Sequence, residues 1–256
     1  HTGFEQSGGY LTGQVRTGAT GTLSGLYLHG RQTGASRYDR IDGGNGLYRS
    51  GFDPQRLDFA MLRYSRPRTL GFDTLSGTVS LNRQADGTFE QTRPTTVLDR
   101  QESVSRALGF QVDAQRRLGG RQQISAGVER YNEALLNAHR EQVNPLTGLS
   151  VPQRPDIPDG TRYSSIGLFA QDVVDLVPGR VNIRGGLRYG HFDFSTRANP
   201  AFGVVDESVT TQAVTFQAGT VLKLARSVDA SFSVSRGFRA PNASDLGSIG
   251  LSGGGG

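Results

Sequence analysis

The sequence predicts an all-β protein whose strands form the wall of an antiparallel, up-and-down transmembrane β-barrel. Three observations predict this fold class: apolar and polar residues alternate along many segments, short turns alternate with long polar segments, and full charges lie on the polar side of the strands. Alternation with a period of two places one face of a strand against an apolar surround and the other against water. About ten such strands are expected.

The composition fits a membrane barrel better than a compact soluble domain. Only 35% of the 256 residues are apolar, the mean hydropathy is -0.42, and the chain contains no Cys. No run approaches the roughly 18 consecutive apolar residues of a membrane helix. A barrel with a polar interior accepts this composition, because only alternate residues of each strand face lipid. The lack of Cys is compatible with an envelope protein that avoids stray disulfides.

The basic residues are almost all arginine. The net charge is +5, and Lys223 is the single lysine among 28 basic residues. A basic balance can indicate nucleic-acid binding, but these arginines are scattered and no basic helix or nucleic-acid motif accompanies them. We therefore expect no nucleic-acid partner, and we expect the arginines to line a wet lumen and loop surfaces, where they would attract anionic solutes.

Turn signals recur along the chain at steps of about 50 residues. They lie near residues 16–21, 67–72, 118–121, 177–180 and 225–228. Long polar segments separate them at residues 30–54, 85–103, 135–160 and 195–210. Short and long connections thus alternate. In an up-and-down barrel this order puts every short turn at one end and every long loop at the other.

The segments between the turns alternate consistently. Apolar members of one face are Leu75, Val79 and Leu81; Val104, Leu108, Phe110, Val112 and Ala114; Ile166, Leu168 and Ala170; Val181, Ile183, Leu187 and Tyr189; Val214, Phe216, Ala218, Leu222 and Leu224; and Val228, Ala230, Phe232 and Val234. Several runs span about 12 to 15 residues, more than the roughly 9 to 11 that a tilted strand needs to cross a bilayer.

The opposite face of these segments carries full charges. Asp113, Arg184 and Arg188 alternate with apolar residues, and a dry core would not accept them without partners. We therefore expect Val181, Ile183, Leu187 and Tyr189 to face lipid, and Arg184 and Arg188 to face a wet lumen.

The sequence holds no catalytic constellation. Its four histidines are scattered, and neither a metalloprotease helix motif, a nucleophile elbow nor a phosphate-binding loop is present. No enzymatic activity, cofactor or metal site is expected. Asp39, Asp42 and Asp53 share a Gly-rich segment that could ligate Ca²⁺, but their spacing matches no EF-hand, and a solvated loop is favoured.

The segment after residue 235 carries the most specific signal. A sorted strand runs into Arg236-Gly237-Phe238-Arg239-Ala240-Pro241, followed by Asp245-Leu246. Proline cannot donate to a ladder, so it ends or edges the sheet. This run closely resembles the late-barrel signature of TonB-dependent outer-membrane receptors, although members of that family more often carry Glu-Leu at the last two positions. Residues 165–172 and 184–189 are similar to a strand pair of the same family.

The resemblance implies a transporter. Family members have a barrel of about 22 strands around an N-terminal plug. Ten strands cannot wrap a plug, so we expect residues 1–256 to be a partial barrel domain, with the plug and the closing strands outside it. The implied function is active uptake of a scarce, bulky nutrient, most often a ferric siderophore, across a Gram-negative-type outer membrane. The implied partners are the TonB complex, membrane lipid and the iron-containing cargo.

Other functions remain open on the sequence. Haem, cobalamin or an oligosaccharide could replace the siderophore, and His139 could serve as an axial haem ligand, although an exposed loop histidine is favoured. A passive porin or adhesin barrel is the alternative of another class, and a soluble all-β carbohydrate-active protein is the third.

Candidate ligand-binding residues follow from the resemblance and from the expected loop and lumen positions. They are Arg239, Asn242, His139, Arg140, Arg184 and Arg188. Phe238 is expected to anchor its strand at the membrane interface.

Overall fold

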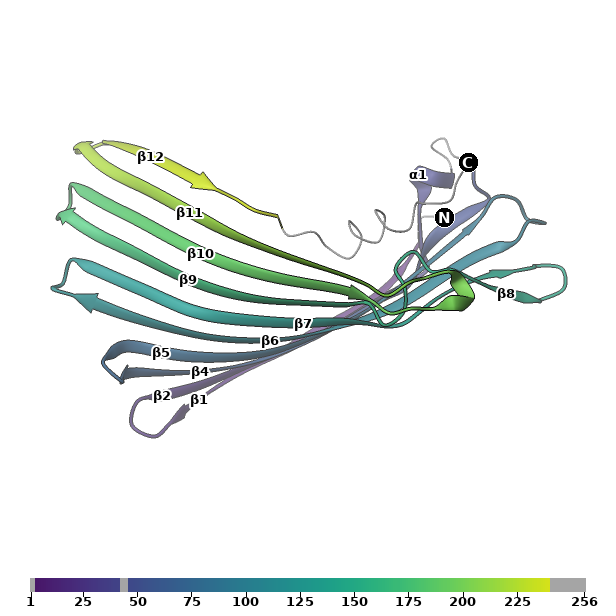
Figure 1. Cartoon of the computed structure of the whole chain (residues 1–256), viewed down its shortest axis with the longest axis horizontal. Helices are drawn as coiled ribbons and strands as arrows, with labels where there is room; N and C mark the ends of the chain where they lie inside the picture. Colours follow the sequence, from purple (N-terminus) through teal and green to yellow (C-terminus); the bar gives the residue numbers. More distant parts are fainter. Residues whose placement is uncertain (1–2, 42–45, 240–256) are drawn as a thin grey trace.

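The computed structural model describes residues 3–41 and 46–239, which form one curved antiparallel sheet (Figure 1). Ten strands pair in chain order: β1 (Glu5–Thr17), β2 (Gly21–Thr33), β4 (Arg49–Thr69), β5 (Phe72–Gln91), β6 (Leu98–Leu118), β7 (Gln122–Val143), β9 (Arg162–Val177), β10 (Val181–Thr196), β11 (Glu207–Ala225) and β12 (Val228–Arg236). Within the described residues β1 and β12 are the two edges of an open sheet. The predicted all-β, up-and-down arrangement is confirmed.

Four short elements complete the described residues. β3 (Ala35–Ser36) pairs with β4, and β8 (Ser150–Gln153) pairs with the end of β7. The helices are α1 (Tyr38–Ile41) and the 3-10 turn η1 (Pro200–Phe202). Neither these nor any other helix in the described ranges has the length and apolar content needed to cross a bilayer.

Short turns and long connections lie at opposite ends of the sheet, as the alternating spacing predicts (Figure 1). The β4–β5 turn is formed by Leu70 and Gly71, both at positive φ of 53° and 81°. Two central residues with positive φ make a turn whose twist matches that of the flanking strands. The same end holds the β6–β7 and β9–β10 turns. The long connections at the other end carry β3, α1, β8 and η1.

The central strands are longer than the sequence predicts. β4 to β7 contain 21, 20, 21 and 22 residues, whereas runs of about 12 to 15 were expected. Much of the segments 85–103 and 135–160 is strand, because β5 continues to Gln91 and β7 to Val143. A polar composition indicates that both faces of a segment are exposed to water. It does not exclude a strand, because backbone hydrogen bonding requires only a neighbouring strand. The strands were therefore predicted too short, because their polar ends were assigned to loops.

The register sorts the two faces of the sheet. One row of directly paired residues crosses eight strands and is almost wholly apolar: Leu23, Tyr64, Gly77, Val112, Val128, Leu168, Tyr189 and Val214 lie side by side. The adjacent row lies on the opposite face and is mostly polar: Thr22, Ser65, Ser76, Asp113, Gly127, Phe169, Arg188 and Thr215. The sheet therefore has one apolar face and one polar face.

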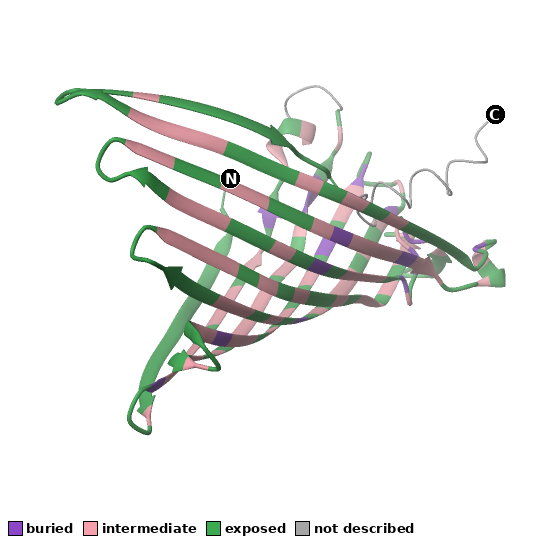
Figure 2. Ribbon diagram, turned by 60° about the vertical axis from the view of Figure 1, so that its left-hand side comes forward, coloured by how far each residue is buried: buried purple, intermediate pink, exposed green. Residues whose placement is uncertain are grey.

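The predicted division of the β10 residues between two faces is confirmed. Ile183, Leu187 and Tyr189 share the apolar face, and Arg184 and Arg188 share the polar face. Leu187 is 61% exposed. Figure 2 shows how little of the sheet is buried. Large apolar side chains left exposed in rows require an apolar surround.

Not every arginine follows the sequence expectation. Arg83 and Arg106 were expected in a lumen or on loops, yet they pair directly with each other on the apolar face. Alternation fixes this placement, because Arg83 lies two residues after Leu81 and Arg106 two residues before Leu108.

Candidate functional site

Two ion pairs bridge non-adjacent strands on the polar face. Arg63 of β4 reaches over β5 to Asp113 of β6, with Nη2 lying 3.1 Å from both carboxylate oxygens. Arg188 of β10 reaches over β9 and donates to Glu129 of β7. Side chains converge across an intervening strand on a concave surface, so the polar face is the inside of the curved sheet.

Neutral side chains also form hydrogen bonds with the Arg63–Asp113 pair. The Nη1 of Arg63 donates to the Thr78 hydroxyl at 3.0 Å, and Gln111 donates to the Asp113 carboxylate at 3.3 Å. Only 14% of the Asp113 side chain is exposed. This site is therefore fixed by four side chains from three strands, and it holds its charges in defined positions.

Arg184 differs from these paired arginines. It shares the inner face with Arg188, is exposed, and forms no ion pair or side-chain hydrogen bond within residues 3–41 and 46–239. It presents an uncompensated guanidinium towards the turn end of the inner face.

Aromatic rings follow the same inner face. Phe192 of β10 lies 6.4 Å from Tyr163 of β9 and 5.8 Å from Phe238, measured between ring centroids. The chain leaves the ladder after Arg236, the last residue of β12, which is directly opposite Phe216. The period of two no longer fixes side chains beyond that point. Phe238, which was expected to anchor its strand at the membrane interface, instead has its ring packed on the inner face against Phe192.

A charged cluster lies at the loop end of the inner face. Arg140 of β7 binds Asp99 of β6 through two hydrogen bonds, of 2.8 Å from Nε and 2.9 Å from Nη2. Its Nη1 donates to Asp156 at 3.0 Å. The hydrogen bonds and charge of Asp99, aided by Asp156, raise the pKa of Arg140 above its ordinary value. Arg140 therefore ties the loop after β8 to the barrel strands.

A small cavity adjoins this cluster. It has a volume of about 280 Å³ and lies between the end of β7, β8 and η1, with His139, Arg140 and Phe202 among its lining residues. His139 is exposed and directly opposite Glu102, so it points to the other face of β7 from Arg140. His139 and Arg140, which were both named from the sequence, therefore line the same cavity.

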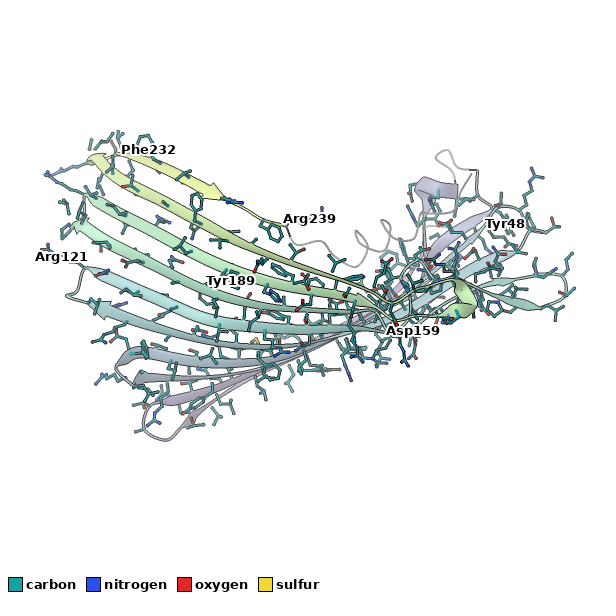
Figure 3. The ribbon with its side chains drawn as sticks, in the orientation of Figure 1. Tyr48, Arg121, Asp159, Tyr189, Phe232 and Arg239 are labelled. Carbon is teal, nitrogen blue, oxygen red and sulfur yellow. The ribbon has the colours of Figure 1, made fainter. Side chains whose placement is uncertain are left out.

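Figure 3 shows Arg239 just beyond the end of β12, as the last of the described residues. Asn242 and the motif residues Ala240, Pro241, Asp245 and Leu246 lie outside the described residues. Arg188 and Phe238 share the inner face with Arg140, which lies at its loop end. Within the described ranges no three His, Asp or Glu side chains gather as a metal site.

Sequence reasoning missed the partners of these residues. Arg63, Glu129, Tyr163 and Phe192 were not selected. Alternation counted from Arg188 places only Phe192, which lies on the same strand β10, on the inner face. Alternation does not give the register between strands, and this register determines which side chains are in contact.

A family model described as TonB dependent receptor-like, beta-barrel matches residues 2–256. The chain belongs to this family. No curated protein matches the chain.

Solved structures of family receptors show the same fold. The copper transporter OprC superposes with a TM-score of 0.73 at 11% identity, covering 91% of this chain and 36% of that one. The unliganded ferric citrate transporter FecA gives 0.71 at 15% identity, covering 98% and 38%. The ferric-catecholate import receptor Fiu of E. coli K12 gives 0.64 at 14% identity, covering 93% and 47%. This chain thus spans less than half the length of each.

Proposed function

We propose that this chain forms part of the barrel wall of an outer-membrane receptor that imports a bulky iron complex, most often a ferric siderophore, in a Gram-negative-type bacterium. Residues 1–256 are then a partial barrel domain, and the plug and closing strands belong to a longer chain. Family membership supports this proposal, as do the open edges β1 and β12 of the described sheet. Import is energised by the TonB complex and breaks no bond in the cargo.

The separation of the sheet into two faces is the observation that carries the proposal. An exposed apolar face suits lipid, and a concave face of charges and aromatic rings suits a wet lumen. All long connections gather at one end. A solute entering from that end would meet the cavity beside Arg140 first, and then the inner wall.

The chemistry of the inner face suits an anionic, aromatic chelate. Guanidinium groups bind carboxylate and other oxyanions through paired hydrogen bonds. The Tyr163, Phe192 and Phe238 rings supply a surface on which flat chelating groups can stack. The names of the similar structures, which include ferric citrate and ferric catecholate receptors, favour this cargo class over haem or cobalamin.

The test uses the full-length receptor in cells and in detergent. Uptake of radiolabelled ferric siderophore is measured with and without the TonB complex, and binding is measured by fluorescence quenching. Replacing Arg140→Gln should weaken binding about tenfold, because the loop after β8 loses its tie to β6 while the barrel still assembles. Arg93→Gln is the matched control, since Arg93 lies in the β5–β6 loop and its side chain forms no ion pair within the described residues.

Two results would reject the proposal. Uptake that is independent of the TonB complex would make the protein a passive porin. Binding of haem or an oligosaccharide, with no binding of ferric siderophores, would assign a different cargo.

A further inference from the structure

Each of the five short turns carries an exposed arginine. Arg121, Arg180 and Arg226 lie within the β6–β7, β9–β10 and β11–β12 turns, and Arg16 and Arg68 lie two residues before the β1–β2 and β4–β5 turns. Figure 3 shows Arg121 at the far turn end of the sheet. Successive hairpins are two strands apart, so neighbouring members of this set are spaced by roughly 10 Å. We call these five residues the turn arginines.

Backbone hydrogen bonds hold two of the turn arginines at equivalent positions. Arg121 and Arg180 each donate their amide to the carbonyl three residues back, at 3.3 Å and 2.9 Å. The residue before each is a glycine at positive φ, of 72° and 71°. The carbonyl of each then accepts a hydrogen bond from the next hairpin, at 2.7 Å from the amide of Asp175 and 2.8 Å from that of Lys223. The backbones that carry these guanidinium groups are therefore fixed relative to the neighbouring strands.

Cations outnumber carboxylates around the turns. Nine Arg or Lys residues and four Asp residues lie in the segments 16–22, 66–74, 116–123, 172–182 and 223–229. Three of the four carboxylates accept hydrogen bonds from neutral groups: Asp172 from Gln122 at 2.6 Å, Asp175 from Asn182 at 2.8 Å, and Asp73 from the backbone amide of Arg117. These carboxylates form no ion pair with the cations beside them within the described residues.

The loop end differs from the turn end in this respect. At the loop end Arg140 forms an ion pair with Asp99, and Arg40 forms one with Glu90. The turn arginines form neither an ion pair nor a side-chain hydrogen bond within the described part of the chain. The turn end therefore carries a row of regularly spaced cations that the described residues do not neutralise, and such a row attracts an anionic partner.

We propose that the turn arginines bind the carboxylate groups of peptidoglycan, the polymer beneath a Gram-negative-type outer membrane. The proposal rests on the outer-membrane placement proposed above, in which the turn end faces the periplasm. Guanidinium groups bind carboxylates through paired hydrogen bonds, but a single exposed contact is weak. A polymer with many carboxylates contacts several fixed cations at once, and its affinity then exceeds that of any one contact.

The arrangement of the turn arginines favours this polymer over other anionic partners. A phospholipid headgroup offers one phosphate, so it cannot bridge turns that are roughly 10 Å apart. The core of a protein–protein interface is depleted of charged residues, whereas here each hairpin presents a cation. A row of single cations therefore suits an extended chain with repeated carboxylates.

The experiment measures co-sedimentation of the full-length, folded receptor, in phosphatidylcholine nanodiscs, with protease-treated peptidoglycan sacculi. The triple variant R121Q/R180Q/R226Q removes three of the turn arginines. Each exposed contact contributes about threefold in affinity, so binding should weaken about 30-fold. The matched control is R31Q/R83Q/R106Q, which removes three exposed arginines on the loop side of the sheet. It should bind sacculi like the wild type.

Unchanged binding by R121Q/R180Q/R226Q would overturn the proposal, as would equally tight binding of the wild type to sacculi with amidated carboxyl groups. Binding only to sacculi that retain their proteins would overturn it in favour of an acidic protein partner. Full competition by short-chain phosphatidylglycerol would overturn it in favour of single lipid headgroups.

Two further measurements separate this proposal from the receptor function. A heat-modifiability gel verifies that each variant is folded. Ferric siderophore binding by R121Q/R180Q/R226Q should equal that of the wild type, because the turn arginines lie at the opposite end of the sheet from the long connections. A failure of sacculus binding alone therefore leaves the proposed receptor function intact.

Discussion

Replacing Asp113→Asn tests whether the bridging ion pairs stabilise the barrel wall. The substitution keeps the size of the side chain and removes its charge. Arg63 would then remain on the inner face without its carboxylate, held only by Thr78 and the new amide.

The magnitude follows from distance and exposure. Two unit charges about 4 Å apart attract by about 4 kcal/mol at an effective dielectric constant near 20. Solvent screening reduces this, because 35% of the Arg63 side chain and 14% of the Asp113 side chain remain exposed. Exposed pairs contribute about 0.2–1 kcal/mol, whereas breaking a buried pair costs about 3–5 kcal/mol. We expect a loss of about 1–2 kcal/mol.

The assay is urea unfolding of the full-length receptor in lipid vesicles. A double-mutant cycle with Arg63→Gln isolates the pair, and the coupling should be about 1 kcal/mol. Asp229→Asn is the control, since Asp229 is exposed on β12 and lacks an ion pair within the described residues. Coupling below about 0.5 kcal/mol, the scatter of independent sites, would refute the reasoning.

Two further predictions concern orientation and pH. In the membrane-embedded receptor, a cysteine at Arg188 should react with a water-soluble maleimide and one at Leu187 should not; the reverse pattern would invert the faces. Burial raises the pKa of Asp86, which lies on β5 beyond Arg83, towards the loop end of the sheet. A raised folded-state pKa means that its contribution is present at low pH and is lost as pH rises through that pKa. Asp86→Asn should therefore stabilise the receptor in denaturant at about pH 7 but not at about pH 3. An equal effect at both pH values would contradict this assignment.

Local sequence patterns determined the strands, their faces and the order of connections. Leu187 and Arg188 were assigned to opposite faces correctly because the period of two is a property of the extended backbone, and it needs no knowledge of a partner strand. The turn at Leu70 and Gly71 was located for a similar reason, since turn chemistry is local. The motif after residue 235 indicated the family, which the match over residues 2–256 shows.

Tertiary structure decided what each side chain meets. Arg63 and Asp113 are fifty residues apart and lie on non-adjacent strands, and only the register and curvature of the sheet bring them together. The same holds for Arg83 opposite Arg106, a pairing that places two cations on the apolar face. Phe238 left the alternating pattern once β12 ended, and a tertiary contact with Phe192 then fixed its ring. Alternation with a period of two specifies the face on which a residue lies. Pairing across strands depends on other segments of the chain, which the local sequence does not contain.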